Sequence, residues 1–338
     1  MNPRVSVIIP TYNRKEWLAE AIDSVERQTF TDFEILVVDH GSTDGTAAML
    51  KARAPDRVRV LQIPNCPLPA CPRNEGIRAA GGEFIAFLDS DDLWLPTKLD
   101  RQIKFLEQAP EAGWCYANAR RFGEGLRTQD VEAGPWQLRE GRVFSALLNG
   151  NFIPACTVMV RRSCLVTVGV FSLDPEVRGS EDYELWLRLA ARYPIAVVRE
   201  TLALYRVSPH QMSSDLSRAH VSEIRALESA FQGLRVAEPA RRRALAAVHL
   251  RHFRSALLAG GGNGDPFLRE SLRLDPWRPR AWLYWIFFRW MGRSLTTSWF
   301  QREKSAKRFL WGLTERLRRT SARDQRKEKG PASALDPE

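Results

Sequence analysis

The chain has 338 residues, of which 44% are hydrophobic and 27% are charged, and this composition excludes a disordered or fibrous protein. It holds 50 basic and 40 acidic side chains, and thirteen basic but four acidic residues lie between positions 289 and 329. A basic carboxyl-terminal region on a nearly neutral body predicts a surface for anions, lipid headgroups or nucleic acid.

The cysteines and the apolar runs of the sequence indicate in which cellular compartment the protein is expected. None of the five cysteines forms a C-x-x-C pair and no His stands at zinc-ligand spacing, so neither a zinc module nor a redox dithiol is predicted. The first residues lack the features of a signal peptide. The longest apolar run, 281–288, is far shorter than the ~20 residues that span a bilayer. We therefore expect a reduced, cytoplasmic protein without a membrane-spanning helix.

Short apolar runs in the first part of the chain predict strands that are buried on both faces. These runs are residues 5–9, 34–38, 58–63 and 84–88. Apolar residues recur at helical spacing from Leu18 to Val25, and a second helical pattern covers 44–53. The alternation of strand and helix predicts a doubly wound α/β sheet.

Polar residues follow three of these strands, at 10–14, 39–44 and 89–92. Because doubly wound sheets bind ligands beyond the carboxyl ends of their strands, a site is expected there. From about Ser217 the pattern becomes helical, and the glycine-rich stretch 260–264 is typical of a connector. The predicted organisation is an α/β domain over 1–215, an α-helical extension over 216–315 and a disordered tail over 316–338.

The pair Asp89 and Asp91 carries the first chemical signal. Two carboxylates two residues apart, just past a buried strand, can together hold a divalent ion. Hard oxygen ligands without a Cys or His cluster favour Mn²⁺ or Mg²⁺. The alternative is that residues 89–92 only cap the following helix and complement its dipole.

Four segments, in their order and spacing, resemble the nucleotide-binding half of family-2 glycosyltransferases. They are residues 5–14, 34–46, 73–76 and 82–92, and the resemblance covers 3–210. It implies that 1–215 has the GT-A fold, and it implies an inverting transfer, a nucleotide-sugar donor and a metal held by an Asp-x-Asp motif.

The resemblance also implies roles for individual residues. The donor-binding residues would be Pro10, Thr11, Tyr12, Asn13, Asp39, His40, Arg73, Asp89, Ser90 and Arg206. Asp91 would be the principal metal ligand, Asp89 would approach both the ribose and the metal, and His210 would complete the metal shell. A purely structural role is the alternative for His210.

His40 stands where the family commonly has a second acid that contacts the uracil imide. A neutral imidazole can hydrogen bond to a base edge, although it is not an acceptor-only group like a carboxylate. A UDP-sugar is the expected donor. The alternative is that His40 is a plain polar residue of the turn after the strand.

The proline-rich segment 66–72 differs from the family. Its Cys66 and Cys71 could pair, bind a metal, or only stand in a loop that three prolines make rigid. Arg73, which follows, would contact the diphosphate or anchor the loop. The alternative for Arg73 is an ordinary surface salt bridge.

Glu181 and Asp182 come directly before a helical Leu-Trp run and follow an expected acceptor-side strand at 157–161. An inverting transfer needs a general base that removes the proton of the acceptor hydroxyl. The resemblance implies that Asp182 is this base and that Glu181 supports it or contacts the acceptor. The alternative is that both acids only complement the helix dipole.

Aromatic and basic residues are interleaved near the carboxyl end, among them Trp282, Trp285, Trp290 and the basic residues after Arg289. This pattern suits a helix on an anionic membrane surface, because the rings lie at headgroup depth and the cations meet the lipid. The alternative is that the rings pack onto the catalytic domain. Nucleic acid is a poorer explanation, since no known binding module accompanies the basic run.

We therefore expect a metal-dependent inverting glycosyltransferase of surface polysaccharide or glycan assembly, cytoplasmic or peripheral on the inner face of the membrane. Its substrates would be a nucleoside-diphosphate sugar and a glycan or lipid-linked acceptor. One alternative is a catalytically silent nucleotide-sugar-binding scaffold of the same fold. Another, a dinucleotide oxidoreductase, is disfavoured because residues 10–13 replace the G-x-G-x-x-G turn after the first strand.

Overall fold

The computed structural model describes residues 2–53, 57–123, 138–208, 215–258, 264–290 and 296–300. Three predictions fall outside these ranges and are not taken further. They concern His210, most of the glycine-rich connector and the predicted disordered tail over 316–338.

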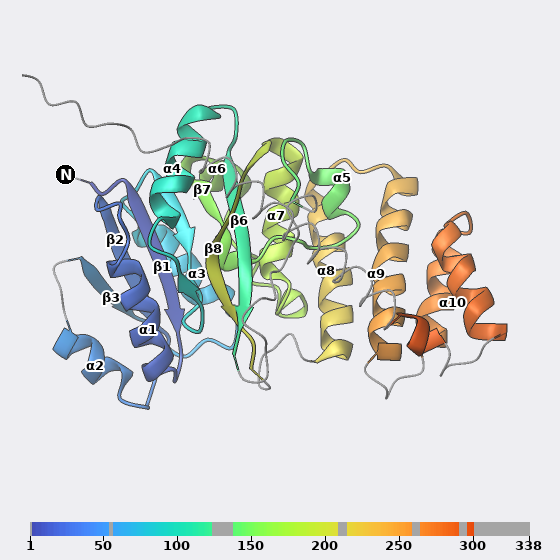
Figure 1. The fold of residues 1–338 in the computed structure, drawn as a ribbon, viewed down its shortest axis with the longest axis horizontal. Coiled ribbons are helices and arrows are strands. Elements are labelled where there is room, and N and C mark those ends of the chain that lie inside the picture. The colour runs from blue at the N-terminus through green and yellow to red at the C-terminus, as the bar shows by residue number, and fades with distance from the viewer. Residues whose placement is uncertain are drawn as a thin grey trace, which may run out of the picture.

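One sheet of eight strands forms the centre of the described chain, in the order β3-β2-β1-β4-β7-β6-β8-β5 (Figure 1). The strands are β1 Val5–Thr11, β2 Phe33–Asp39, β3 Val58–Gln62, β4 Phe84–Phe87, β5 Leu93–Trp94, β6 Trp114–Phe122, β7 Met159–Arg161 and β8 Ile195–Arg206. The first four strands pair in parallel, whereas β7 is antiparallel to both of its neighbours. The parallel half confirms the predicted α/β sheet.

Helices cover both faces of the sheet and continue beyond it. They are α1 Lys15–Glu26, α2 Thr46–Arg53, α3 Ala70–Ala79, α4 Lys98–Gln108, α5 Phe144–Leu147, α6 Arg162–Val168, α7 Glu181–Arg192, α8 Leu216–Gly233, α9 Glu238–Leu258 and α10 Asp265–Leu274. Residues 279–290 and 296–300 are also helical. Two short 3₁₀ turns, Ala155–Thr157 and Pro175–Val177, complete the elements.

The alternation of side chains along β1 shows how the two faces are covered. Val5, Val7 and Ile9 point to one face, where they pack with α1 and α4, and Ile8 points to the other face with α3 and α7. Successive side chains of a strand lie on opposite faces, so a run that is apolar at every position is buried on both sides. The prediction of a doubly covered strand at 5–9 is confirmed.

The prediction for residues 58–63 is wrong in one respect. These residues form β3, but β3 is the edge strand of the sheet and its side chains are mostly exposed or half-buried. Val60 points outward and is 38% exposed. An edge strand is paired on one side alone, and neither of its faces is fully covered by the helices.

The helical extension packs directly onto the catalytic part. Figure 1 shows α7, α8 and α9 side by side in a row that leads away from the sheet. Leu227 and Phe231 of α8 belong to the same hydrophobic cluster as Trp114 of β6 and Trp186 of α7. Among the helices that the structure describes, none combines the length and the apolar character that crossing a bilayer requires.

Candidate active site

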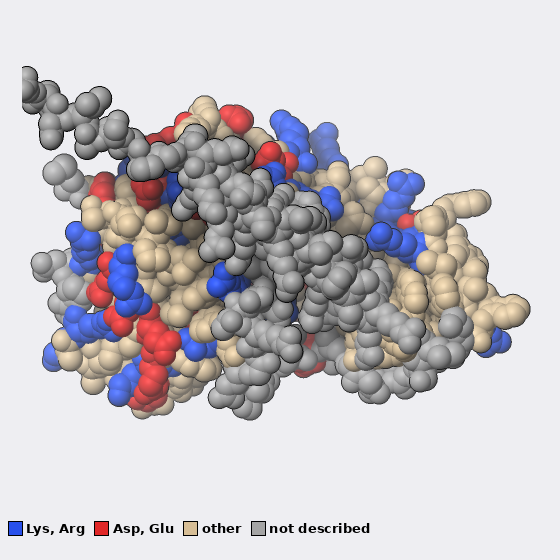
Figure 2. Space-filling model, viewed as in Figure 1, with Lys and Arg blue, Asp and Glu red and all other residues tan. Residues whose placement is uncertain are grey.

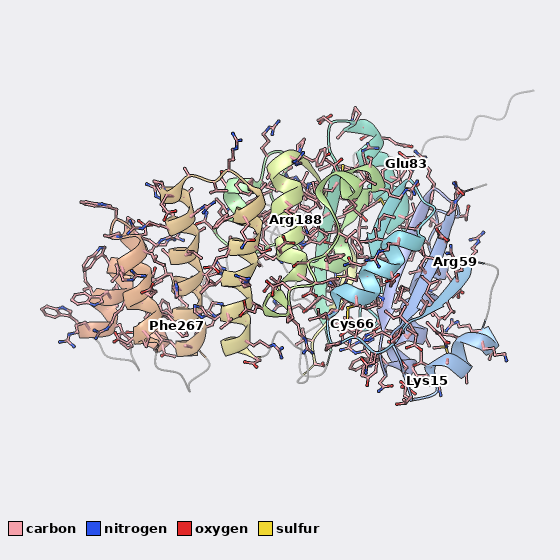
Figure 3. The ribbon with its side chains drawn as sticks, turned by 180° about the vertical axis from the view of Figure 1, so that it is seen from behind. Lys15, Arg59, Cys66, Glu83, Arg188 and Phe267 are labelled. Carbon is pink, nitrogen blue, oxygen red and sulfur yellow. A yellow bond between two sulfur atoms is a disulfide. The ribbon has the colours of Figure 1, made fainter. Side chains whose placement is uncertain are left out.

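A single cavity of about 1160 Å³ opens at the carboxyl ends of β1 and β4 and extends to the start of α7. Figure 3 shows Lys15 and Cys66 at this edge of the sheet, whereas Glu83, which precedes β4, lies at the opposite edge. Pockets for one small ligand usually occupy ~300–1,000 Å³. The cavity therefore has room for more than one small ligand.

An aromatic stack lies at one end of the cavity. The rings of Tyr12 and His40 are stacked with their centroids 5.0 Å apart. Burial lowers the pKa of His40, so its ring is neutral at pH 7. Two buried polar atoms here, Thr11 Oγ1 and His40 Nδ1, have no hydrogen-bond partner among the described residues. A planar group that stacks on Tyr12 would bring its polar edge to these atoms.

Asn13 and Asp39 lie beside this end but do not line the cavity. Asn13 adopts a positive φ of 49°, and its side-chain oxygen accepts a hydrogen bond from the Thr43 backbone at 2.7 Å. Asp39 is buried and accepts a hydrogen bond from the Ser42 backbone at 3.0 Å. Both residues shape the turn after β2, and their predicted contact with the donor stays a prediction.

Three carboxylates follow β4 and line the middle of the cavity: Asp89, Asp91 and Asp92. Arg14 Nη1 lies 2.5 Å from Asp91 Oδ2, and Arg73 Nη2 lies 2.5 Å from Asp89 Oδ1. Burial raises the pKa of Asp91 and raises that of Asp92 well above its ordinary value. Asp92 Oδ2 has no hydrogen-bond partner in the described part of the chain.

Arg206 lies behind the carboxylates and is not among the residues that line the cavity. Its guanidinium donates to the Asp91 backbone carbonyl at 2.7 Å and to Glu20 at 2.6 Å, and its backbone N–H donates to Asp92. Arg206 therefore fastens β8 to the carboxylate loop, and its predicted donor contact stays a prediction. Ser90, in contrast, lines the cavity beside Asp89 as expected.

Arg73, at the start of α3, connects the two halves of the site. It is buried, and it donates to Asp89 at 2.5 Å and to Glu181 at 2.8 Å. The two carboxylates raise the pKa of Arg73 against the effect of its burial. This buried bridge replaces the surface salt bridge that was the alternative for Arg73.

Asp182 lies next to Glu181 at the start of α7 and lines the cavity. Burial and the charge of Glu181 raise the pKa of Asp182 to about 7. Its oxygens accept from neutral donors, the Tyr183 backbone and, at 3.3 Å, the Asn151 side chain. A carboxylate with a pKa near neutrality can accept a proton and release it again, as a general base requires.

Cys66 and Cys71 form a disulfide that closes the loop before α3. This pairing settles the alternatives for segment 66–72 and corrects the expectation of fully reduced cysteines. Pro67, Pro69 and Pro72 of the same segment line the cavity beside Arg73. The loop is therefore a covalently closed wall of the site.

Several further residues that line the cavity are not predicted as site residues from the sequence, among them Arg14, Asn151, Arg178 and Glu223. Arg14 could have been found, because it is the last residue of the first polar segment, 10–14. Glu223 comes from α8, so the helical extension reaches the site, and an amphipathic helix gives no sequence sign of such a contact.

The comparison with known proteins identifies the family. Glycosyl transferase family 2 matches residues 6–169. The chain is similar to an Escherichia coli protein described as UDP-Glc:alpha-D-GlcNAc-diphosphoundecaprenol beta-1,3-glucosyltransferase WfgD, with 31% identity over 213 residues, 62% of this chain and 80% of that protein. An uncharacterized glycosyltransferase of Rickettsia felis is 37% identical over 208 residues, and this chain spans 33% of its length.

Solved structures show the fold. TarS residues 1–349 of S. aureus in complex with UDP-GlcNAc superpose with a TM-score of 0.63 at 18% identity, covering 89% of this chain and 92% of that one. The mannosyltransferase PcManGT of Pyrobaculum calidifontis, solved with GDP-Man and Mn²⁺, gives a TM-score of 0.54 at 20% identity, covering 88% of each chain. The chain has the GT-A fold of these enzymes, and it belongs to glycosyl transferase family 2.

Proposed function

We propose that the protein is an inverting, metal-dependent glycosyltransferase that moves a sugar from a UDP-sugar to an acceptor hydroxyl. One observation carries this proposal. A single cavity joins the Tyr12–His40 stack, the carboxylates after β4 and the Asp182 carboxylate, whose pKa is about 7. The stack suits a nucleobase, the carboxylates suit a metal-bound diphosphate, and Asp182 suits an acceptor hydroxyl.

The stacked end of the cavity is the proposed base pocket. A uracil ring offers a flat face to Tyr12 and both donors and acceptors on its edge. His40 Nδ1 and Thr11 Oγ1 are buried without partners and can complete such hydrogen bonds. The structural neighbour TarS is solved with UDP and with UDP-GlcNAc, which supports uridine as the base.

The carboxylates after β4 fit a divalent cation. Among the described residues no group of three or more His, Cys, Asp or Glu side chains could hold an ion, and we propose that substrate oxygens and water supply further ligands. Mg²⁺ is commonly held in this way, by one or two carboxylates and substrate phosphates. Asp91 and Asp89 would hold the ion, and Arg14 would leave Asp91. The ion would neutralise the charge of the leaving diphosphate.

Asp182 and Arg73 have different roles in the proposed transfer. Asp182 takes the proton of the acceptor hydroxyl while the oxygen of that hydroxyl attacks the anomeric carbon. The bond between that carbon and the diphosphate oxygen breaks, and the nucleoside diphosphate leaves. Arg73 holds Asp89 and Glu181 in fixed positions, so the donor and acceptor halves keep their relative geometry.

The proposed acceptor is a glycan or lipid-linked sugar of a surface polysaccharide. The similarity to WfgD, whose name states a diphosphoundecaprenol-linked acceptor, supports this choice. An acceptor of this kind lies in the membrane, so we place the protein at the cytoplasmic face of the membrane as a peripheral protein. A catalytically silent scaffold is the competing proposal, and intact Asp89, Asp91 and Asp182 argue against it.

Calorimetric titration with a panel of nucleotide-sugars, with and without Mn²⁺, tests the proposal. We expect a UDP-sugar to bind in Mn²⁺ and Asp91→Asn to lose most of this binding, because an amide is a weaker ligand for a hard cation. Asp100→Asn, a surface change on α4, is the matched control and should bind like the wild type. Equal Mn²⁺-dependent binding by Asp91→Asn would contradict the metal assignment. Binding without any release of UDP from the donor would favour the scaffold.

A further inference from the structure

The carboxyl-terminal part of the described chain exposes an unusual concentration of apolar side chains. Of the eleven large hydrophobic side chains that are exposed in the described ranges, five lie between positions 277 and 290. Trp277 is 90% exposed and Trp290 is 83% exposed. Monomeric soluble proteins rarely leave contiguous apolar patches in water, and such patches commonly mark interaction sites.

The helix over 279–290 has two apolar faces. Ala281 and Tyr284 are buried against Phe253 of α9, and Trp285 and Phe288 pack on the same cluster. The opposite side carries Trp282, Leu283, Ile286 and Trp290, all of them exposed. Positions 282, 286 and 290 are four residues apart and therefore lie on one side of a helix. The packing of the inner face fixes the direction in which the outer face points.

The carboxyl-terminal aromatics divide between the two faces of this helix. Trp285 is partly buried against the cluster around Phe253, which belongs to the helical extension. Two contacts fix the orientation of the Trp282 ring. Its ring nitrogen donates to the Pro276 carbonyl at 2.7 Å, and its ring contacts that of Trp285 edge-on, with the ring centroids 5.7 Å apart. We call the exposed residues Trp282, Leu283, Ile286 and Trp290 the outer face.

The charges around the outer face are cationic. Arg280 and Arg289 flank it, and both are exposed. No acidic residue occurs from 276 to 290, and Asp275, just before, is paired with Arg278 at 3.2 Å. Figure 2 shows this end of the molecule as mostly uncharged and basic surface, whereas acidic and basic residues are mixed over α1 and α2.

We propose that the outer face is a docking surface for an anionic lipid bilayer. Tryptophan rings insert at the level of the headgroups, and exposed arginines beside them attract anionic lipid. A second protein copy would bring its own Arg280 and Arg289 toward these cations, which opposes a symmetric contact. The bilayer supplies both an apolar layer for the rings and negative charge for the arginines.

Sedimentation of the full chain with phospholipid vesicles tests the proposal. Vesicles of phosphatidylcholine alone are compared with vesicles that also contain phosphatidylglycerol, at ~0.1 M and ~1 M salt, where the Debye length is about 10 Å and 3 Å. We expect binding to the anionic vesicles that is weakened but not abolished by salt, since ring insertion is not screened. No sugar nucleotide is present, so this result is independent of the proposed transferase activity.

Two pairs of variants separate the apolar and the cationic contributions. Ile286→Ala with Trp290→Ala should weaken vesicle binding at least about tenfold, and Arg280→Gln with Arg289→Gln should weaken it at low salt and reduce its salt dependence. The matched controls are Val166→Ala with Leu173→Ala and Arg27→Gln with Lys51→Gln, which change exposed residues elsewhere. Near-ultraviolet circular dichroism checks that every variant is folded.

Three outcomes would overturn the proposal. The first is that the wild type fails to sediment with anionic vesicles at low salt. The second is that Ile286→Ala with Trp290→Ala binds vesicles like the wild type. The third is that sedimentation velocity shows a dimer of the wild type without lipid, and that Ile286→Ala with Trp290→Ala abolishes this dimer. The outer face would then be a contact between two copies of the chain.

Discussion

Two adjacent carboxylates at the start of α7 have opposite surroundings. Glu181 is held by the Arg73 guanidinium at 2.8 Å and by the Gly179 backbone N–H at 2.6 Å. The donors to Asp182 among the described residues are the neutral Tyr183 backbone and Asn151 side chain, and burial and the charge of Glu181 raise its pKa to about 7. The pair therefore separates into a positioning residue and a group that can exchange a proton at neutral pH.

This contrast predicts the pH dependence of the reaction. UDP release from the donor should rise as the pH increases through about 7 and then level off, because Asp182 must be ionised to accept a proton. Asp182→Asn should lower the rate ~10²- to 10⁴-fold and remove this rise, with nucleotide affinity retained. The measurement is UDP release between pH 5 and pH 9, within roughly two pH values of the expected midpoint. A wild-type rate that is flat across pH 7 would refute Asp182 as the base.

The same carboxylate should limit stability at alkaline pH. Its folded-state pKa of about 7 lies above its ordinary value of 3.8, so its favourable contribution to folding exists below the ordinary pKa and is lost as the pH rises through about 7. Asp182→Asn should therefore raise the melting temperature at about pH 8 and have little effect at about pH 4, close to the ordinary pKa. A pKa difference of one is worth about 1.4 kcal/mol, so a gain of up to ~4 kcal/mol is expected. Equal melting temperatures of Asp182→Asn and the wild type at both pH values would contradict the raised pKa of Asp182.

At the scale of elements, the sequence predicts what depends on local pattern. The predictions of β1, β2 and β4 are correct. A strand that is covered on both faces is apolar at nearly every position, and such a run is visible in the sequence. The strand order beyond β4 has no local signal, since β7 joins β4 to β6 across long sequence separations. The exposure of β3 was missed for the same reason, because its edge position depends on the whole sheet.

The candidate site divides in the same way. The resemblance to family-2 glycosyltransferases pointed to Thr11, Tyr12, Ser90, Asp91 and Asp182, which all line the cavity. It could not show that Asn13 and Asp39 shape a turn, or that Arg206 fastens β8 to the carboxylate loop. Such roles depend on which side of a backbone turn a side chain occupies. The contribution of Glu223 from α8 depends on helix packing and is equally absent from local sequence.

The entry to β4 gives a prediction at this scale. A Cβ atom on Gly82 would lie 2.6 Å from the Ser6 backbone nitrogen and 2.9 Å from the Val5 carbonyl carbon. Both atoms belong to β1, so Gly82→Ala should push β4 away from β1 and cost about 1–3 kcal/mol of unfolding free energy. Urea unfolding, monitored by tryptophan fluorescence, measures the change.

A second glycine provides the matched control. A Cβ on Gly233, the last residue of α8, would meet no atom within 4 Å. Gly233→Ala should leave the fold unchanged and add about 0.4–1 kcal/mol, because alanine restricts the unfolded chain. If Gly82→Ala unfolds at the same urea concentration as the wild type, the close packing of the β4 entry on β1 is wrong.

At the scale of the whole molecule, the helical extension is continuous with the catalytic part. Leu227 and Phe231 of α8 and Val248 of α9 share one hydrophobic cluster with Trp186 of α7. The second half of α9 begins a separate cluster around Phe253, which α10 and the helix over 279–290 complete. The boundary at 215 that the sequence predicts therefore separates two sequence patterns but cuts through one core.

This division predicts how the chain responds to shortening. A chain that ends at Asp215 loses the α8 and α9 side chains that share a hydrophobic cluster with α7. It should bind a hydrophobic dye and fail to bind UDP, because it leaves a large apolar face in water. A chain that ends at Leu258 keeps Leu227, Phe231 and Val248 in place. It should retain UDP binding with a lower melting temperature, since Phe253 loses its partners. Calorimetric UDP binding and dye fluorescence distinguish the two chains. Full UDP affinity and the same melting temperature in the chain that ends at Asp215 would show that the extension is an independent domain.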